Sequence, residues 1–403
     1  MSRYGYKAEE KLYAINKFGY FLPGLIFEIL KWIKTNFGDL SCVALSDVCK
    51  RYILEQLTPL KQPLAKLGPI TVSNLSDDLG RNNERIRQGL EPFNYRDYQK
   101  ESLEYLLNKG YGRGLIEVPT SGGKSLILAN FIWNIHKNID AHYKYFILVP
   151  NKQLVTQFYG DLIDYGLNPK LLTKFTRGEK FDKDAMVIIG NRQYLFNNAS
   201  KLPKIDVLIC DEAHTCTAEA SKEFIMGFDA KIKIGCSGTL PRDNYQKWML
   251  IGMFSSIVYE KDIKTLQDAG FISKLKITLL KITDKDVENN TKLLFHTKSE
   301  VKYKVDEFGH SDIEFNDAYN AEHEYFEKNY KDLYKPVFDY LYNLNSNTLI
   351  LFDRINIGKN LFEYAKEIYK DKNVFYIDGS IDVKDREETR AKFEQCDGNL
   401  LIA

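Results

Sequence analysis

Two short segments of the sequence carry residue types suited to phosphate chemistry. The first, EVPTSGGKS at 117–125, contains Gly122 and Gly123, which lack side chains and so let the backbone approach a phosphate closely. Lys124 would reach the outer phosphates, and the Ser125 hydroxyl would ligate Mg²⁺. The loop is completed by Pro119, Thr120 and Ser121. The segment therefore predicts a cradle for the phosphates of a nucleotide.

This segment matches the general phosphate-loop pattern only in part. The pattern has a glycine five residues before the Gly-Lys pair, and this chain has Val118 there. A glycine-rich turn without a nucleotide is therefore the alternative for this segment taken alone.

The second segment is VLICDEAH at 207–214, an acidic pair directly after an apolar run. Asp211 would hold Mg²⁺ through its carboxylate, and Glu212 would orient and deprotonate the attacking water, with His214 beside them. Taken alone, these residues would also suit the first turn of an exposed helix. Together with the phosphate loop they predict a nucleoside triphosphate site with Lys124, Asp211 and Glu212 as its catalytic residues.

The elements that must position these residues alternate along the chain. Short β-branched runs are separated by helical patterns, as expected for parallel strands buried on both faces. The runs lie at 115–118, 145–149, 186–190, 207–211 and 232–237, and a second series lies at 348–352, 374–378 and 399–403. The sequence therefore predicts an α/β fold with two parallel-sheet domains.

Four regions follow from this pattern. We expect a small N-terminal accessory or DNA-binding domain at 1–90 and the nucleotide-binding domain at 91–271. A linker with an insertion is expected at 272–346, where polar residues replace the periodic pattern, and the second domain at 347–403.

Charge and composition narrow the class of protein. The 403 residues carry 56 Lys and Arg against 55 Asp and Glu, a net charge of +1, which excludes a polybasic tail but not a basic groove. Residues 19–33 are apolar but contain Glu28 and Lys31, and they are too short to span a bilayer. The cysteines form no CxxC pair, so we expect buried free thiols in a cytoplasmic protein.

The motifs together resemble those of the superfamily-two helicases. PTSGGKS resembles motif I, DEAH motif II, and SGTLPRD at 237–243 motif III, in which Ser237 and Thr239 would couple the ATP site to nucleic acid. NYRDYQKESL at 94–103 resembles the adenine-reading element, with Arg96 and Gln99, although a solvated helix start is the alternative for Gln99. The resemblance implies RecA-like domains, ATP and Mg²⁺.

Further motifs of the family touch nucleic acid. Motif Ia, motif Ib and motif IV resemble LVPNKQLVTQF at 148–158, IGNRQYLF at 189–196 and LILFDRINIGKNL at 349–361. The candidate contacts that the resemblance implies are Asn151, Lys152, Gln157, Asn191, Arg192, Gln193 and Arg354. For each basic side chain a solvated surface position is the alternative.

The form of motif III and the phrase YIDGSIDVKDREETRAKFE at 376–394 are similar to the phage UvsW-type branch-migrating helicases. This resemblance implies a monomeric, ATP-driven motor that unwinds forked or branched DNA in a host cytoplasm. Aromatic residues near the N-terminus would stack on bases or pack in a core: Tyr20, Phe21, Phe27 and Trp32. The insertion at 284–315 would help to separate or steer strands.

The family continues past a strand like NLLIA into motifs V and VI, the latter with an arginine finger, whereas this sequence reaches Ala403. Since such fingers are worth roughly 10³–10⁵ in rate, we expect ATP binding with slow turnover from these residues and further chain beyond them. Two alternatives stay open. One is an RNA helicase or double-stranded-DNA translocase, and the other is a nucleotide-gated DNA-binding protein with little turnover.

Overall fold

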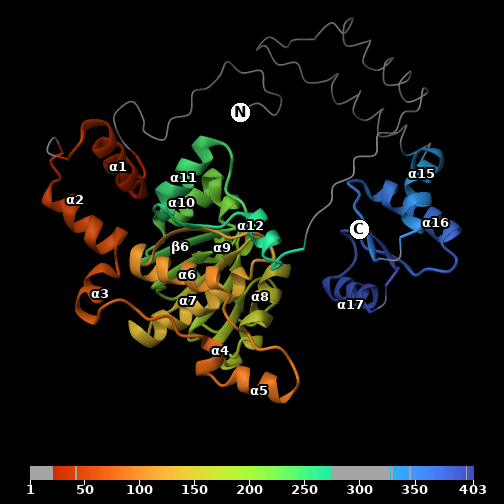
Figure 1. Ribbon diagram of the computed structural model, residues 1–403, viewed down its shortest axis with the longest axis horizontal. Helices are drawn as coiled ribbons and strands as arrows, with labels where there is room; N and C mark the ends of the chain where they lie inside the picture. The colour runs from red at the N-terminus through yellow and green to blue at the C-terminus, as the bar shows by residue number, and fades with distance from the viewer. Residues whose placement is uncertain (1–20, 41–42, 274–326, 328–329, 345, 396) are drawn as a thin grey trace, which may run out of the picture. The chain divides into compact units, whose positions relative to one another are not determined.

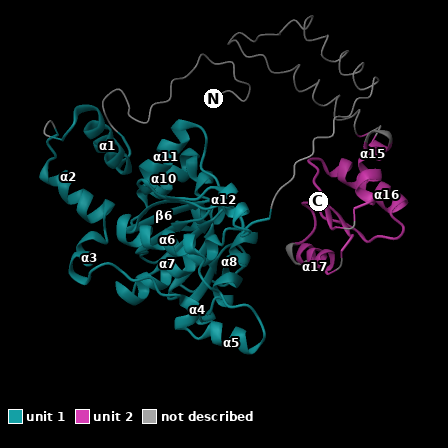
Figure 2. Cartoon of the chain, viewed as in Figure 1, with its two compact units in different colours: residues 1–275 teal, residues 276–403 magenta. Residues whose placement is uncertain are grey.

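The computed structural model describes residues 21–40, 43–273, 327, 330–344, 346–395 and 397–403. The chain divides into two compact units, residues 1–275 and 276–403 (Figure 2). Most of the expected linker, including the insertion at 284–315, and Tyr20 lie outside the described residues. The domain boundaries drawn from the sequence stay a prediction. In the described part of the chain, no helix has the length and apolar character needed to cross a bilayer.

The first unit is built on a seven-stranded parallel sheet with helices on both faces (Figure 1). The strand order is β3-β4-β2-β5-β6-β1-β7. The strands are β1 (Arg113–Glu117), β2 (Tyr145–Val149), β3 (Leu172–Phe175), β4 (Val187–Asn191), β5 (Val207–Cys210), β6 (Ile232–Ser237) and β7 (Ile257–Glu260). Its central strands are buried along their whole length, as the continuous apolar runs predicted.

Each face of this sheet has its own core. One face is covered by α6 (Asp97–Glu104), α7 (Lys124–Asn138) and α8 (Lys152–Asp164), and the other by α9 (Arg192–Asn198), α10 (Glu219–Gly227) and α11 (Asn244–Phe254). α12 (Ile263–Asp268) follows the last strand. Because α7 begins at the carboxyl end of β1, the phosphate loop lies at that edge of the sheet.

The N-terminal part of the unit consists of short helices laid along this core. They are α1 (Ile26–Phe37), α2 (Asp47–Tyr52), α3 (Lys61–Leu67), α4 (Leu75–Asp78) and α5 (Arg81–Arg87), with helical turns at Pro23–Leu25 and Ile53–Leu57. Among the aromatic residues proposed to stack on bases, Trp32 is 60% exposed and Phe21 37% exposed, so neither is a core residue. Their role in stacking stays a prediction.

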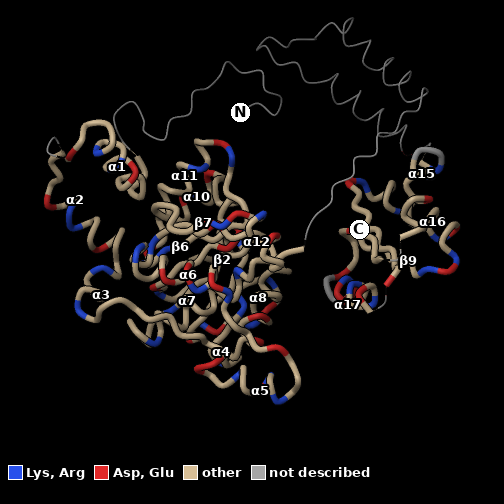
Figure 3. Tube along the Cα trace, in the orientation of Figure 1, with Lys and Arg blue, Asp and Glu red and all other residues tan. Residues whose placement is uncertain are grey.

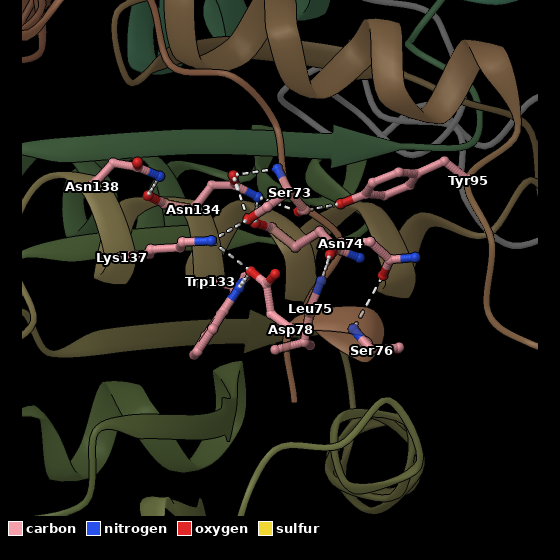
Figure 4. Close-up of polar contacts among 11 residues, drawn as sticks. Ser73, Asn74, Leu75, Ser76, Asp78, Tyr95, Trp133, Asn134, Lys137 and Asn138 are labelled. Atoms are coloured by element: carbon pink, nitrogen blue, oxygen red, sulfur yellow. Dashed lines mark hydrogen bonds and ion pairs between the residues drawn. The ribbon is translucent and has the colours of Figure 1, made fainter. Parts of the chain in front are cut away.

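The extended segment before α4 is fixed to α7 by side-chain amides. Asn134 accepts a hydrogen bond from the Ser73 N–H at 2.9 Å and donates one to the Ser73 carbonyl at 2.9 Å (Figure 4). Trp133, one residue before Asn134 on α7, and Lys137, three residues after it, both donate to Asp78. The amide of Asn134 therefore satisfies the backbone of Ser73 as a neighbouring strand would.

The second unit has a three-stranded parallel sheet of order β8-β10-β9. The strands are β8 (Thr348–Ile350), β9 (Val374–Tyr376) and β10 (Leu400–Ile402), and the helices are α15 (Tyr330–Tyr342), α16 (Ile355–Ile368) and α17 (Val383–Glu394). Its core contains Phe338, Leu361 and Ile402. The predicted α/β fold with two parallel sheets is therefore confirmed.

Two details differ from the sequence prediction. β3 and β7 were not among the predicted strands, because Lys174 and Glu260 interrupt short runs at the two edges of the sheet. Cys210, Cys216 and Cys236 are buried free thiols as expected, but Cys49 is exposed on the short helix α2.

Candidate nucleotide site

The phosphate loop joins β1 to α7. The Val118 N–H donates to the Ser237 carbonyl of β6 at 3.0 Å, which ties the start of the loop to the sheet. Gly123 lies in the left-handed region at φ +75°, and a side chain there would also meet the Gln99 Nε2 at 2.3 Å. The local sequence thus needs glycine both for backbone conformation and for space.

The adenine-reading element lies against this loop. The Tyr98 hydroxyl and the Gln99 Nε2 both donate to the Gly122 carbonyl, at 2.7 and 3.0 Å. The Gln99 Oε1 accepts the Arg96 N–H at 2.9 Å, and the Gln99 side chain is buried. Gln99 therefore has both amide atoms bonded within the protein, and its contact with a base stays a prediction.

Sequence reasoning missed an aromatic residue next to this element. Phe271 is 41% exposed, its ring centroid lies 5.9 Å from that of Tyr98, and the Arg96 guanidinium lies 4.9 Å from its centroid. Arg96 also donates to the Phe271 carbonyl at 3.3 Å. Phe271 belongs to no motif, and its sequence distance from Gln99 hid the contact.

Asp211 follows β5, and its N–H donates to the Leu148 carbonyl at 2.9 Å. Its Oδ1 is buried without a hydrogen-bond partner among the described residues. Burial and, next, the neighbouring Glu212 raise the pKa of Asp211 from 3.8 to about 6, while Lys124 opposes the rise. A buried carboxylate oxygen with no partner fits a cation ligand, so these residues fit Mg²⁺.

Glu212 links the two motifs. Its Oε1 lies 3.4 Å from the Lys124 Nζ, and its Oε2 lies 3.3 Å from the His214 Nδ1. Its backbone is left-handed at φ 49°, a strained conformation for a residue with a side chain. Lys124, the predicted phosphate-binding cation, and Glu212, the predicted base, are therefore direct neighbours.

A contact chain continues from His214 into motif III. The His214 Nδ1 lies 2.9 Å from the Ser237 Oγ, which donates to the Thr239 carbonyl at 2.8 Å. Ser237 and Thr239 thus contact the acidic motif through one histidine. Their coupling role stays a prediction, while the structure supplies the physical path.

Ser125 is the other predicted magnesium ligand. Its Oγ lies 2.8 Å from the Tyr165 hydroxyl, and burial raises the pKa of that tyrosine to about 12. The Ser125 hydroxyl would have to exchange Tyr165 for the metal. Tyr165 was not predicted, because it ends a helix with no motif of its own.

A recess of about 370 Å³ opens beside Lys124 and Glu212. Its walls come from the phosphate loop, the acidic motif, motif III and α11: Thr120, Glu212, His214, Gly238, Thr239, Leu240, Pro241 and Gln246. Gly238 keeps it open, since a side chain there would lie 3.0 Å from the Thr120 Oγ1. Glu117, which was missed, accepts the Leu240 N–H at 3.0 Å and holds the rim.

The candidate nucleic-acid residues divide into two groups. Three make hydrogen bonds within the first unit: Asn151 accepts the Leu154 N–H and caps α8, Asn191 is buried and accepts the Thr176 hydroxyl, and Arg192 donates to the Thr215 carbonyl.

The other four residues differ in their exposure. Lys152, Gln157 and Gln193 are exposed, and Arg354 is half-buried where α16 begins in the second unit. Lys and Arg are interspersed with Asp and Glu along both units (Figure 3), so charge alone does not mark a track for nucleic acid. All seven contacts stay predictions.

Comparison with known proteins supplies a family context. Residues 92–242 match the family described as the res subunit of type III restriction enzymes (ResIII). The chain is 26% identical over 314 residues to the ATP-dependent DNA helicase uvsW of Enterobacteria phage T4, covering 76% of this chain and 57% of the relative. It is 23% identical over 197 residues to the helicase/translocase subunit XPB of Schizosaccharomyces pombe, covering 45% and 24%.

Comparison with solved structures supports the fold through one of them. An S. cerevisiae Dbp5 variant bound to RNA and ADP BeF3 gives a TM-score of 0.50 at 13% identity, covering 84% of this chain and 75% of that one. The UvsW helicase from bacteriophage T4 gives 0.43 at 24% identity, covering 64% and 85%. In the sequence comparison, the chain spans only 57% of the full length of the phage relative.

Proposed function

We propose that this chain, which is related to the superfamily-two helicases, is an ATP-dependent helicase or translocase that acts on forked or branched DNA. The observation that carries the proposal is the contact chain from Lys124 through Glu212 and His214 to Ser237, beside an open recess. The lysine that would bind phosphate, the carboxylate that would act as base and the hydroxyl that would couple the site to nucleic acid thus belong to one continuous series of contacts.

The Lys124 ammonium would contact the outer phosphates of ATP in the recess. Asp211, with its unpartnered Oδ1, and Ser125 would hold Mg²⁺, which would supply positive charge to stabilise the phosphates. Phosphate competes with Glu212 for Lys124, and losing that ion pair frees the Glu212 carboxylate to orient a water molecule. Glu212 would then accept the proton of that water.

The response to nucleic acid would travel through His214. Its ring contacts both Glu212 and Ser237, so a change at motif III alters the partner of the proposed base. Phe271, exposed beside Arg96, would pack against the adenine.

The choice of DNA rests on the names of the relatives, a DNA helicase of a phage and a DNA repair helicase/translocase. RNA is the alternative substrate, because residues that hold ATP and the nucleic-acid backbone do not read the sugar. We also propose a monomer in the host cytoplasm.

Steady-state ATP hydrolysis with single-stranded DNA, forked DNA and RNA added in turn tests the proposal. Lys124→Ala should abolish turnover, whereas Glu212→Gln should still bind ATP and DNA but not hydrolyse. Stronger stimulation by RNA than by forked DNA would contradict the DNA assignment. Retained ATP binding with no turnover under any condition would instead support a nucleotide-gated DNA-binding protein.

A further inference from the structure

A second cavity, of about 170 Å³, lies at the opposite edge of the first unit's sheet. Its walls include Arg113, the first residue of β1, and Lys233, the second residue of β6. The nucleotide site lies beyond the other ends of these strands. The cavity is therefore separate from the site described above.

The two cations are direct neighbours in the sheet. Arg113 and Lys233 are register partners on adjacent parallel strands, so their side chains share one face. Each residue is only 6% exposed. Two like charges placed side by side and removed from water repel each other and lose hydration, which costs folding free energy.

The protein does little to neutralise this pair. The Lys233 Nζ donates to the Ile225 carbonyl at 2.8 Å, and the Arg113 NH1 makes only a long 3.5 Å contact with the Met253 carbonyl. The buried Arg113 Nε has no partner, and within the described ranges neither cation has an ion pair. Burial and then Arg113 lower the pKa of Lys233 to about 8.

The opposite wall of the cavity comes from the N-terminal part of the unit. Pro23, Tyr52, Gln56 and Leu57 line it, facing Phe228 and Met253 of the ATP-binding core. Asp229 also lines the cavity, but it is exposed. It raises the pKa of Lys233, and among the groups that shift this pKa its contribution is the smallest. A group bound here would join the N-terminal helices to the sheet.

We propose that this cavity binds one phosphate-type oxyanion between Arg113 and Lys233. Two adjacent, buried and uncompensated cations are what such an anion requires, and the Arg113 Nε has a free donor for it. Pockets for drug-sized ligands measure about 300–1,000 Å³, so this smaller cavity suits a phosphate group and excludes a whole nucleotide. The source is either free inorganic phosphate or the terminal phosphate of a nucleic-acid strand.

Thermal unfolding of the full chain, followed by tryptophan fluorescence, tests this site. All three tryptophans, Trp32, Trp133 and Trp248, belong to the first unit. Inorganic phosphate at low-millimolar concentration is compared with potassium chloride of equal ionic strength. A Lys124→Ala chain controls for phosphate binding at the phosphate loop, and it should keep the phosphate-dependent rise in Tm.

Lys233→Met is the decisive variant, and Lys231→Met, an exposed lysine of the same sequence stretch, is its control. In chloride, Lys233→Met should be at least as stable as the parent, because a repelling buried cation is gone. In phosphate it should lose the Tm rise and bind phosphate at least tenfold more weakly. An equal rise in both chains would overturn the proposal, since general salting-out by phosphate acts on every variant.

If Lys233→Met does not fold, crystals of the parent chain soaked in selenate provide a second measurement. An anomalous peak between Arg113 and Lys233 is expected, and its absence beside an occupied phosphate loop would refute the site. A 5′-phosphorylated oligonucleotide that displaces inorganic phosphate, where its 5′-hydroxyl counterpart does not, would identify a strand end as the source. Failure of both oligonucleotides would leave free phosphate as the ligand.

Discussion

Asp211→Asn should stabilise the nucleotide-free first unit while abolishing magnesium-dependent nucleotide binding. The pKa of Asp211 rises from 3.8 to about 6 through burial and the charge of Glu212. At 1.36 kcal/mol per pH unit, this rise corresponds to a folding penalty of about 3 kcal/mol for the ionised carboxylate. Asparagine keeps the shape without the charge, so up to this amount should be recovered.

The raised pKa of Asp211 also determines how the free energy of unfolding changes with pH. Because the pKa of Asp211 is raised in the folded chain, the folded state binds more protons than the unfolded state between pH 3.8 and about 6. The parent's free energy of unfolding therefore loses this contribution as the pH rises through that window, and the full loss is present above it. The variant's advantage should be largest at pH 8 and vanish near pH 4.

Urea unfolding followed by tryptophan fluorescence measures the difference in the first unit alone. Asp184→Asn, at an exposed carboxylate of the same unit, is the matched control and should change little at either pH. Adding Mg²⁺ and ADP should stabilise the parent but not Asp211→Asn. An equal gain at pH 4 and pH 8, or a loss at pH 8, would refute the assignment of the penalty to a buried charge.

Three further substitutions test other parts of the unit. Gly123→Ala should weaken binding of a fluorescent nucleotide at least tenfold, about 1.4 kcal/mol, because φ is +75° there, whereas Gly227→Ala in open space should not. Ser237→Ala should leave basal ATP hydrolysis within about threefold but remove its stimulation by DNA; unchanged stimulation contradicts the coupling path. Asn134→Leu should lower the free energy of unfolding by about 2–3 kcal/mol, because the N–H and the carbonyl of Ser73 both lose their partner. The control is Asn138→Ala, which removes an amide that contacts one helical carbonyl and should cost clearly less. Equal losses in the two variants would count against the role of the Asn134 amide.

Much of the fold followed from local patterns. Apolar runs between helical segments were enough to predict the central parallel strands, because a strand buried on both faces has few alternatives. The resemblance to the superfamily-two helicases is supported by the ResIII match over residues 92–242. The phosphate loop and the acidic motif were also found together, since both follow strands at one edge of a parallel sheet.

The missed residues share a physical reason. Phe271 and Tyr165 contact the site from segments far away in sequence, and no local spacing signals such contacts. Glu117 lies within the phosphate-loop segment, but its partner Leu240 is 123 residues away. The amide of Asn134 and the pairing of Arg113 with Lys233 likewise depend on which elements are neighbours in space. A single sequence specifies these neighbours only through the finished fold.

The strand order has a consequence for how the chain folds as it is made. β1 comes first in sequence, yet its partners are β6 at Ile232–Ser237 and β7 at Ile257–Glu260. Loop closure over such a separation is slow, and synthesis proceeds at roughly 5–20 residues per second. The phosphate loop is therefore expected to lack its β6 neighbour on the ribosome until Ser237 has emerged, and the proposed nucleotide site of a nascent chain is complete only after that point.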